Sequence, residues 1–256
     1  MKITFLGTGP SQGIPIIGSR HPVCLSKNPK DKRLRSSILI EQNKIYLLID
    51  CGPDFRYQML RSNHNKLDAI FITHEHHDHI GGLDDIRSIC LKMNKEIPVY
   101  GLRRTIKNIK ERFFYIFLNN YKSIASKISF HELDNYKKIC FMEHLKIIPL
   151  FIWHGILPIL GFRIENFAYI TDASDIPIQT IQQLKGLDIL VLNVLRKFPK
   201  HTSRITILES LKMIQKISPK KAYLTHVGHI LGFHEEIEKN FPKNIYLAYD
   251  GLIINV

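Results

Sequence analysis

The sequence has no long hydrophobic run, although 45% of its 256 residues are hydrophobic. The apolar stretch at residues 3–6 stops at Gly7, which is too short for the core of a signal peptide. No later run approaches the ~18 residues that a membrane span requires. We therefore expect a globular, cytoplasmic protein that does not use a membrane as a partner.

Cysteine is scarce. The four cysteines, Cys24, Cys51, Cys90 and Cys140, are spread along the chain without close pairs. This spacing argues against a scaffold held together by disulfides and suits a reducing compartment.

The chain is basic but lacks a block of like charges. Lys and Arg total 36 against 23 Asp and Glu, which gives a formal net charge of +13. The charge could serve an anionic partner such as RNA or a phosphate ester. It could also follow from the heavy use of Lys all along the chain, which the absence of a basic tail favours. No internal repeat, low-complexity tract or long linker is visible. At 256 residues the chain can bury one large core, so we expect one domain over residues 1–256.

Short apolar runs alternate with helical patterns, as is typical of an α/β protein. Two sets of strands, separated by a loop-rich and helical middle, favour a sandwich of two mixed sheets flanked by helices. The strands expected are residues 2–6, 36–41, 45–49, 67–72, 98–100, 145–150, 160–164, 168–170 and 222–225, and the helices are residues 55–61, 83–87 and 105–120.

One segment concentrates metal-ligand side chains at the end of an apolar strand. Residues 73–79 read Thr-His-Glu-His-His-Asp-His, and a glycine pair that allows a tight bend follows them. Neutral imidazole and carboxylate are ligands that zinc, manganese and iron accept. His74 and His76 could share one ion, and Asp78 and His79 could hold a second. A solvated turn is the alternative, but the strand before the segment and the glycines after it favour a metal site.

Further candidates also follow apolar strands. His154, Asp172 and His226 each lie where an expected strand ends, and the His-rich segment needs additional ligands of these types. Asp50 closes the strand at residues 45–49. It either begins a turn or accepts a hydrogen bond from a metal-bound histidine.

The His-x-His-x-Asp-His order resembles the signature of the metallo-β-lactamase superfamily, and the likeness extends along the whole chain. Within the superfamily the chain is similar to the branch that contains the phosphoribosyl cyclic phosphate phosphodiesterase of phosphonate breakdown and, more distantly, tRNase Z. The residues that carry this likeness are Gly7-Thr8-Gly9 with Gln12-Gly13, Leu34-Arg35-Ser36-Ser37, Gly52-Pro53-Asp54-Phe55-Arg56, residues 73–79, Gly82-Leu83-Asp84-Asp85-Ile86-Arg87, His154-Gly155 with Leu160-Gly161-Phe162, Thr225-His226-Val227-Gly228-His229 and Tyr249-Asp250-Gly251.

The resemblance implies a four-layer αββα sandwich and two divalent metal ions, zinc or manganese. The implied ligands are His74, His76 and His154 for one ion, Asp78, His79 and His226 for the other, and Asp172 for both. It also implies that Asp50 supports a metal-bound histidine from behind. Asp78 would in addition accept a hydrogen bond from the nucleophilic water.

The chain departs from its relatives at an outer metal site. In that branch a Cys-x-Cys-x-x-Cys segment and a histidine hold a separate structural zinc. The matching positions here are Ser19, His21 and Cys24, with His229 as the fourth. Histidine can replace cysteine as a zinc ligand, but serine is a poor one, so the site is either three-coordinate with water or lost.

A second departure concerns the catalytic candidates His201 and Arg204. Similar proteins tend to carry histidine at both positions, and the later one is thought to assist the leaving group. Arginine cannot donate a proton at neutral pH, but its guanidinium can bind phosphate oxygens. Either His201 takes over the proton transfer, or the site relies on charge stabilisation alone.

Two metal ions can lower the pKa of a bridging water to about 7 and so create hydroxide at neutral pH. This chemistry fits phosphodiesters, lactones, thioesters and β-lactams alike, and the phosphodiesterase-like motifs with the basic balance favour a small or cyclic phosphodiester. The alternatives are a tRNA-processing endonuclease of the tRNase Z type, a hydrolase of another ester or lactone, and a non-catalytic nucleic-acid-binding protein that uses its positive charge. No Gly/Lys-rich arm for a tRNA elbow stands out, and binding alone gives no reason to keep seven ligands. The resemblance also implies a homodimer.

Overall fold

The computed structural model describes residues 1–118, 127–143, 145–196 and 205–256. These residues group into two compact units. The first unit comprises Met1–Gly7, Arg35–Leu133 and Gly251–Asn255, and the second comprises Thr8–Leu34, Asp134–Asp250 and Val256. The single domain over residues 1–256 stays a prediction.

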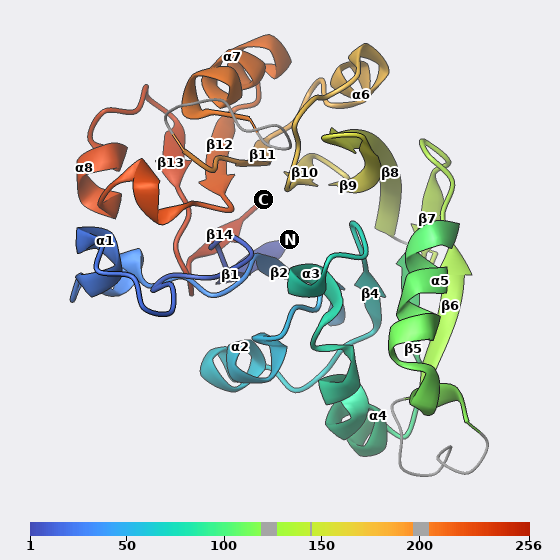
Figure 1. Cartoon of the computed structure of the whole chain (residues 1–256). Helices are drawn as coiled ribbons and strands as arrows, with labels where there is room; N and C mark the ends of the chain where they lie inside the picture. Colours follow the sequence, from blue (N-terminus) through green and yellow to red (C-terminus); the bar gives the residue numbers. More distant parts are fainter. Residues whose placement is uncertain (119–126, 144, 197–204) are drawn as a thin grey trace. The chain divides into compact units, whose positions relative to one another are not determined.

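Seven strands form the sheet of the first unit, in the order β14-β1-β2-β3-β4-β5-β6 (Figure 1). Their bounds are β1 Lys2–Gly7, β2 Ser37–Gln42, β3 Ile45–Ile49, β4 Ala69–Phe71, β5 Ile97–Gly101, β6 Ile128–Glu132 and β14 Ile253–Asn255. The strands from β14 to β3 are antiparallel neighbours, whereas β3 to β6 run parallel. The parallel half therefore gathers several carboxyl ends at one edge, which is where ligands bind in such sheets.

Helices of the first unit flank this sheet. They are α2 Phe55–Ser62, α3 His77–Ile80, α4 Arg87–Met93 and α5 Arg103–Arg112, with the 3-10 helices η2 Leu83–Ile86 and η3 Phe114–Phe117. Helix α2 packs against β1, and α5 packs against β5 and β6 (Figure 1). Leu48, Ile70 and Val99 are fully buried in the core between the sheet and its helices. Ile72 and Ile80, which flank the His-rich segment, belong to the same core, so this core gives the segment after β4 a rigid base.

The second unit has its own seven-stranded sheet, in the order β13-β12-β11-β10-β9-β8-β7. The bounds are β7 Ile139–Phe141, β8 Leu145–His154, β9 Leu157–Ile164, β10 Phe167–Ile170, β11 Ile189–Asn193, β12 Lys221–Thr225 and β13 Ile245–Leu247. Strands β10 to β13 run parallel, and β7 to β10 are antiparallel neighbours. All residues of β11 are buried, as expected for a central parallel strand.

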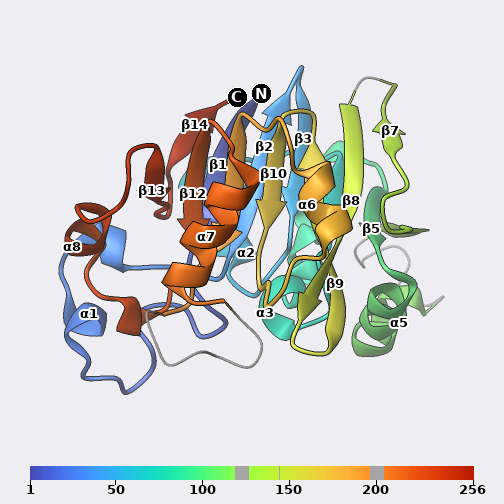
Figure 2. The same cartoon turned by 90° about the horizontal axis from the view of Figure 1, so that it is seen from above.

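The second unit also contains helices. They are α1 Pro22–Leu25, α6 Ile178–Gln183, α7 Ile207–Ile217 and α8 His234–Glu238, with the 3-10 helices η1 Pro29–Asp31 and η5 His229–Leu231. Helix α7 packs on β11 and α6 on β8 (Figure 2). A capping box of Thr206 and Glu209 begins α7, because the two residues satisfy each other's backbone N–H groups.

Several predicted elements have different bounds in the structure. The strand expected at residues 67–72 is shorter, since Asp68 Oδ2 accepts the hydrogen bond from Tyr46 N that a strand partner would otherwise accept. The helix expected over 105–120 ends at Arg112, where a run of aromatic residues with low helix propensity begins. The strand expected at 145–150 continues to His154.

Each unit thus contributes one seven-stranded mixed sheet with flanking helices. This confirms the predicted α/β class of two mixed sheets flanked by helices, the components of the αββα sandwich. Among the described residues, no helix combines the length and the apolarity that crossing a membrane requires.

Candidate metal centre

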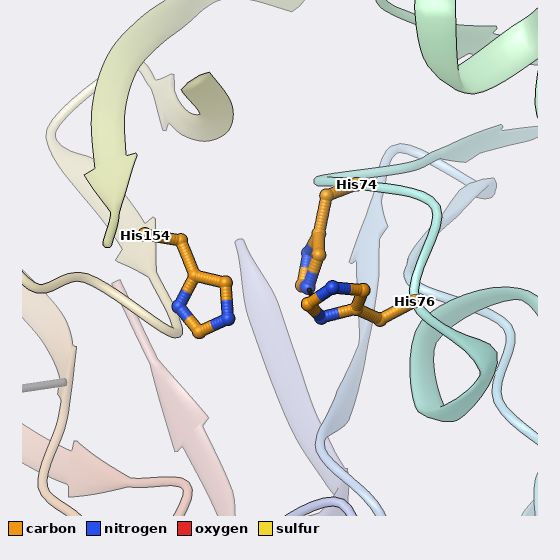
Figure 3. Close-up of side chains that lie close together, drawn as sticks. All are labelled: His74, His76 and His154. Carbon is orange, nitrogen blue, oxygen red and sulfur yellow. Dashed lines mark hydrogen bonds between the residues drawn. The ribbon is translucent and has the colours of Figure 1, made fainter. Parts of the chain in front are cut away.

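The first unit carries four candidate ligands directly after β4. His74 and His76 precede α3, and Asp78 and His79 lie within it. The imidazoles of His74 and His76 meet edge to face (Figure 3), with Nε2 of His74 3.0 Å from Nδ1 of His76. Oδ2 of Asp78 lies 3.2 Å from Nε2 of His79. The unit therefore presents two pairs of ligand atoms at the carboxyl end of a parallel strand.

Close backbone approach explains the glycines beside this segment. A Cβ atom on Gly82 would lie 2.2 Å from the carbonyl oxygen of Gly52, and a Cβ on Gly52 would lie 2.1 Å from that of Asp78. Gly81 and Gly82 have ordinary φ values of −61° and −97°. The pair thus serves close packing and not an unusual backbone conformation.

Asp50 lies behind this group, just after β3, and is fully buried. Its Oδ2 accepts a hydrogen bond from His79 Nδ1 at 2.7 Å, and its Oδ1 accepts one from Thr73 N at 2.8 Å. The Thr73 hydroxyl donates to the same carboxylate at 2.9 Å, so it accepts from His74 Nδ1, also at 2.9 Å. A neutral imidazole with its proton on Nδ1 carries its lone pair on Nε2. Asp50 thereby assigns the metal-binding tautomer to both His79 and His74.

Burial raises the pKa of Asp50, and the His79 ring and the hydrogen bonds from His79 and Thr73 oppose that rise. The contact with His79 therefore stabilises the ionised form of Asp50, which burial destabilises.

Three candidate ligands lie at strand ends in the second unit. His154 is the last residue of β8 (Figure 3), Asp172 follows β10 and His226 follows β12. His154 Nδ1 donates to the backbone carbonyl of Asp172 at 2.7 Å, which leaves the lone pair of the ring on Nε2. Nε2 of His226 lies 3.2 Å from Oδ2 of Asp172. The second unit therefore presents a carboxylate and two imidazoles, all three buried.

The turns that carry Asp172 and His226 are conformationally unusual. Both residues have left-handed backbone, with φ of 57° and 56°, which is uncommon outside glycine and clusters at functional sites. Asn193, at the end of β11, braces the first turn, because its side chain accepts from Ala173 N at 2.9 Å and donates to Ala173 O at 3.1 Å. Asn193 was not predicted from the sequence, although a polar residue that ends an apolar strand is the signal that identified Asp172.

The glycine-rich loop after β1 contacts the turn of His226. The carbonyl of Thr8 accepts a hydrogen bond from Val227 N at 2.8 Å. The Asp250 carboxylate accepts from Thr8 N at 2.9 Å, from the Thr8 hydroxyl at 2.7 Å and from Leu34 N at 2.8 Å. Asp250 therefore holds this loop against the turn, a role that the sequence did not indicate.

The outer candidates are only partly brought together. The rings of His21 and His229 lie edge to face with centroids 4.9 Å apart, while His21 Nδ1 accepts from Val23 N and so caps α1. Cys24 is buried. Within the described ranges, the three outer candidates do not form a set of ligand atoms that all lie within 4.8 Å of one another. The outer structural zinc stays a prediction.

The donor sets of both units suit a borderline divalent metal such as zinc. With Zn–N distances of about 2.0–2.1 Å, the edge of a tetrahedral zinc site measures about 3.3 Å. The ligand-atom pairs at 3.0, 3.2 and 3.2 Å match that edge. Neutral imidazoles with assigned tautomers, next to carboxylates, are the ligand chemistry that zinc and manganese accept.

Of the three catalytic candidates, the structure describes only Asp78. Asp78 is buried within α3, beside His79. His201 and Arg204 lie outside the residues that the structure describes.

Comparison with known proteins supports a hydrolase of this type. The family model of the beta-lactamase superfamily domain matches residues 46–227, a stretch that contains all seven candidate metal ligands. The crystal structure of a new diphosphatase from the PhnP family is 38% identical in sequence, with a TM-score of 0.92, and the match covers 100% of this chain and 97% of that one.

Two curated proteins are also similar. A protein named octanoyltransferase from Porphyromonas gingivalis is 38% identical over 254 residues, which cover 98% of this chain and 51% of that protein. Ribonuclease Z from Prochlorococcus marinus is 31% identical over 179 residues, or 66% of this chain and 48% of that enzyme. The chain thus spans about half the length of the curated relatives it matches. Since the family model covers most of the chain and the resemblance inferred from the motifs is confirmed, the chain belongs to the β-lactamase superfamily, in the PhnP-like branch of its metallo-β-lactamase-fold hydrolases.

Proposed function

We propose that the chain is a dinuclear metal-dependent hydrolase that cleaves a phosphodiester or diphosphate bond in a small substrate. The proposed ligands are His74, His76 and His154 for one ion, Asp78, His79 and His226 for the other, and Asp172 for both. The observation that carries this proposal is the 38% identity to a diphosphatase along the whole chain. The tautomers assigned by Asp50 and by the Asp172 carbonyl support it.

Two divalent ions, when bound, supply water ionised at neutral pH and positive charge for the oxyanions of the transition state. The protein's own residues would prepare the site. Asp50 keeps the proton of His79 on Nδ1, and Asp78 would accept a hydrogen bond from the attacking water and so orient it. His201 as proton donor and Arg204 as a phosphate-binding group remain predictions.

A second candidate function is the processing of RNA. The similarity to ribonuclease Z and the formal net charge of +13 favour it, because an RNA backbone needs positive charge along its path. We keep it second, since the similarity to the diphosphatase is higher and covers the whole chain.

One experiment separates these functions. Purified protein would be supplied with zinc or manganese and given bis-p-nitrophenyl phosphate, cyclic phosphates, dinucleoside diphosphates and a pre-tRNA, with Asp172→Ala as the matched inactive control. We expect metal-dependent turnover of a small phosphodiester or diphosphate that the control lacks. Turnover of the pre-tRNA alone would favour the second candidate, and no turnover of any substrate would contradict both. Light scattering of the same sample tests the proposed homodimer, and cell fractionation tests the proposed cytoplasmic location.

A further inference from the structure

Glu75 lies between two proposed metal ligands, and its carboxylate is buried. The residue is 8% exposed. A carboxylate inside a protein is stable only when charged or hydrogen-bonding partners compensate for the water that it loses. Since neither the motif nor the proposed ligand set gives Glu75 a task, its partners show what it does.

Two residues in the first turn of α5 compensate for that burial. Arg104 Nε donates to Oε1 of Glu75 at 2.7 Å, and Arg104 Nη2 donates to Oε2 at 3.1 Å. The Thr105 hydroxyl donates to Oε2 at 3.0 Å, and Thr105 is fully buried. A guanidinium fork fixes the direction of a carboxylate as well as its position. The start of a helix also favours a negative charge.

These contacts join the segments that follow two neighbouring strands of the first unit. Helix α5 follows β5, which pairs in parallel with β4. Glu75 is one residue from each imidazole, so fixing its side chain restricts the backbone torsions on both sides. Those torsions set the 3.0 Å between Nε2 of His74 and Nδ1 of His76.

We infer that Arg104 and Thr105 are positioning residues for the metal centre. Through Glu75 they hold His74 and His76 at the spacing of two ligands on one ion, and so raise the affinity for that ion. Outer contacts of this kind commonly change metal affinity by about 10–100-fold. The inference rests on the proposed function, which supplies the metal.

Zinc affinity, measured in competition with a chromophoric chelator, tests the inference without any substrate. The variants are Arg104→Gln, Arg104→Lys, Thr105→Val and Glu75→Gln. The matched control is Arg103→Gln. Arg103 precedes Arg104 in the chain, but its side chain is 88% exposed and its Nε lies 3.9 Å from Oε1 of Glu132. Thermal unfolding of each metal-free variant is recorded in parallel.

We expect Arg104→Gln and Glu75→Gln each to lower the affinity for one of the two zinc ions about tenfold. The double variant with both Arg104→Gln and Glu75→Gln should bind zinc no more weakly than Glu75→Gln alone, because both changes remove the same contact. Arg104→Lys and Thr105→Val each keep part of the contact and should lose roughly threefold. Arg103→Gln should bind as the wild type does.

Wild-type zinc affinity in Arg104→Gln and Thr105→Val, even with a lowered unfolding temperature, would overturn the inference and leave the proposed function intact. If Arg104→Gln does not fold, Arg104→Lys and Thr105→Val decide by the same criterion. A wild-type protein that binds neither zinc nor manganese would overturn the proposed function and this inference with it.

Discussion

Replacement of Asp50 by Asn should weaken metal binding far more than it weakens the metal-free fold. Asn can still accept the hydrogen bond from Thr73 N, but its NH₂ group would face His79 Nδ1 in place of Oδ2. The ring would then have to accept at Nδ1 and carry its proton on Nε2, the atom that should bind the metal. The chain of bonds from Asp50 through the Thr73 hydroxyl to His74 would be disturbed as well.

The size of the effect follows from these contacts. Loss of a group that orients a metal-bound histidine weakens metal affinity by about 10–100-fold, or about 1.4–2.7 kcal/mol. At saturating metal, the stabilisation of the folded protein by bound metal falls by the same free energy. In a chain of this size that corresponds to about 3–10 °C in Tm. The metal-free protein keeps a neutral group of the same shape, so its Tm should change less.

Differential scanning calorimetry of wild type and Asp50→Asn, each with excess zinc and with excess chelator, measures the Tm of the metal-free protein and the Tm shift caused by zinc. The matched control is Asp68→Asn. Asp68 precedes β4 at the opposite end of the strand and binds Tyr46 N and Lys95, so this variant should keep the full shift caused by zinc. An equal zinc-induced shift in Asp50→Asn and wild type would refute the reasoning.

Three further predictions concern catalysis and stability. Asp78→Ala should abolish turnover even where one ion remains bound, and near-normal rates with full metal content would show that its role is wrong. Arg204→Ala should lower phosphodiester turnover by about one to two orders of magnitude without changing metal content, because a guanidinium–phosphate contact contributes ~1.5–3 kcal/mol. Arg204→His should raise the turnover of alkyl esters relative to that of the p-nitrophenyl ester. Equal rates for wild type, Arg204→Ala and Arg204→His on both ester types would place Arg204 outside the site. Burial, and then the charge of Arg33, lower the pKa of His234 to about 4, so the unfolded chain binds this proton more readily and stability should fall as the pH drops from about 6.5 to about 4. Urea unfolding in the presence of chelator should show a flatter dependence in His234→Gln, and identical pH profiles would contradict that assignment.

The strands and the positions of the candidate ligands were largely predictable from the sequence. His154, Asp172 and His226 were all predicted by one rule, that a ligand-type residue follows an apolar run, and in the structure each lies at or just after the end of a strand. The strands β2 and β3 and the helix α2 also agree closely with the expected elements, because their patterns are local.

Apart from the contact of Asp50 with a metal-site histidine, which the resemblance implied, the supporting contacts were not predictable, because they join residues far apart in the chain. The fork of Arg104 on Glu75 spans 29 positions, and the bond from Thr8 to Asp250 spans 242. Nothing in the residues near Glu75 indicates which arginine compensates for its burial. The end of α5 was missed for another reason: the aromatic residues after Arg112 continue the apolar pattern, while the backbone changes to a 3-10 turn.

The metal content of the purified protein tests the central claim most directly. Elemental analysis of wild type, His154→Ala and Asp172→Ala would count the ions per chain. We predict about two transition-metal ions in the wild type, fewer in His154→Ala and fewest in Asp172→Ala, because the Asp172 carboxylate is proposed to serve both ions. A wild-type protein that carries no metal, and regains no hydrolytic activity when zinc or manganese is added, would contradict the account.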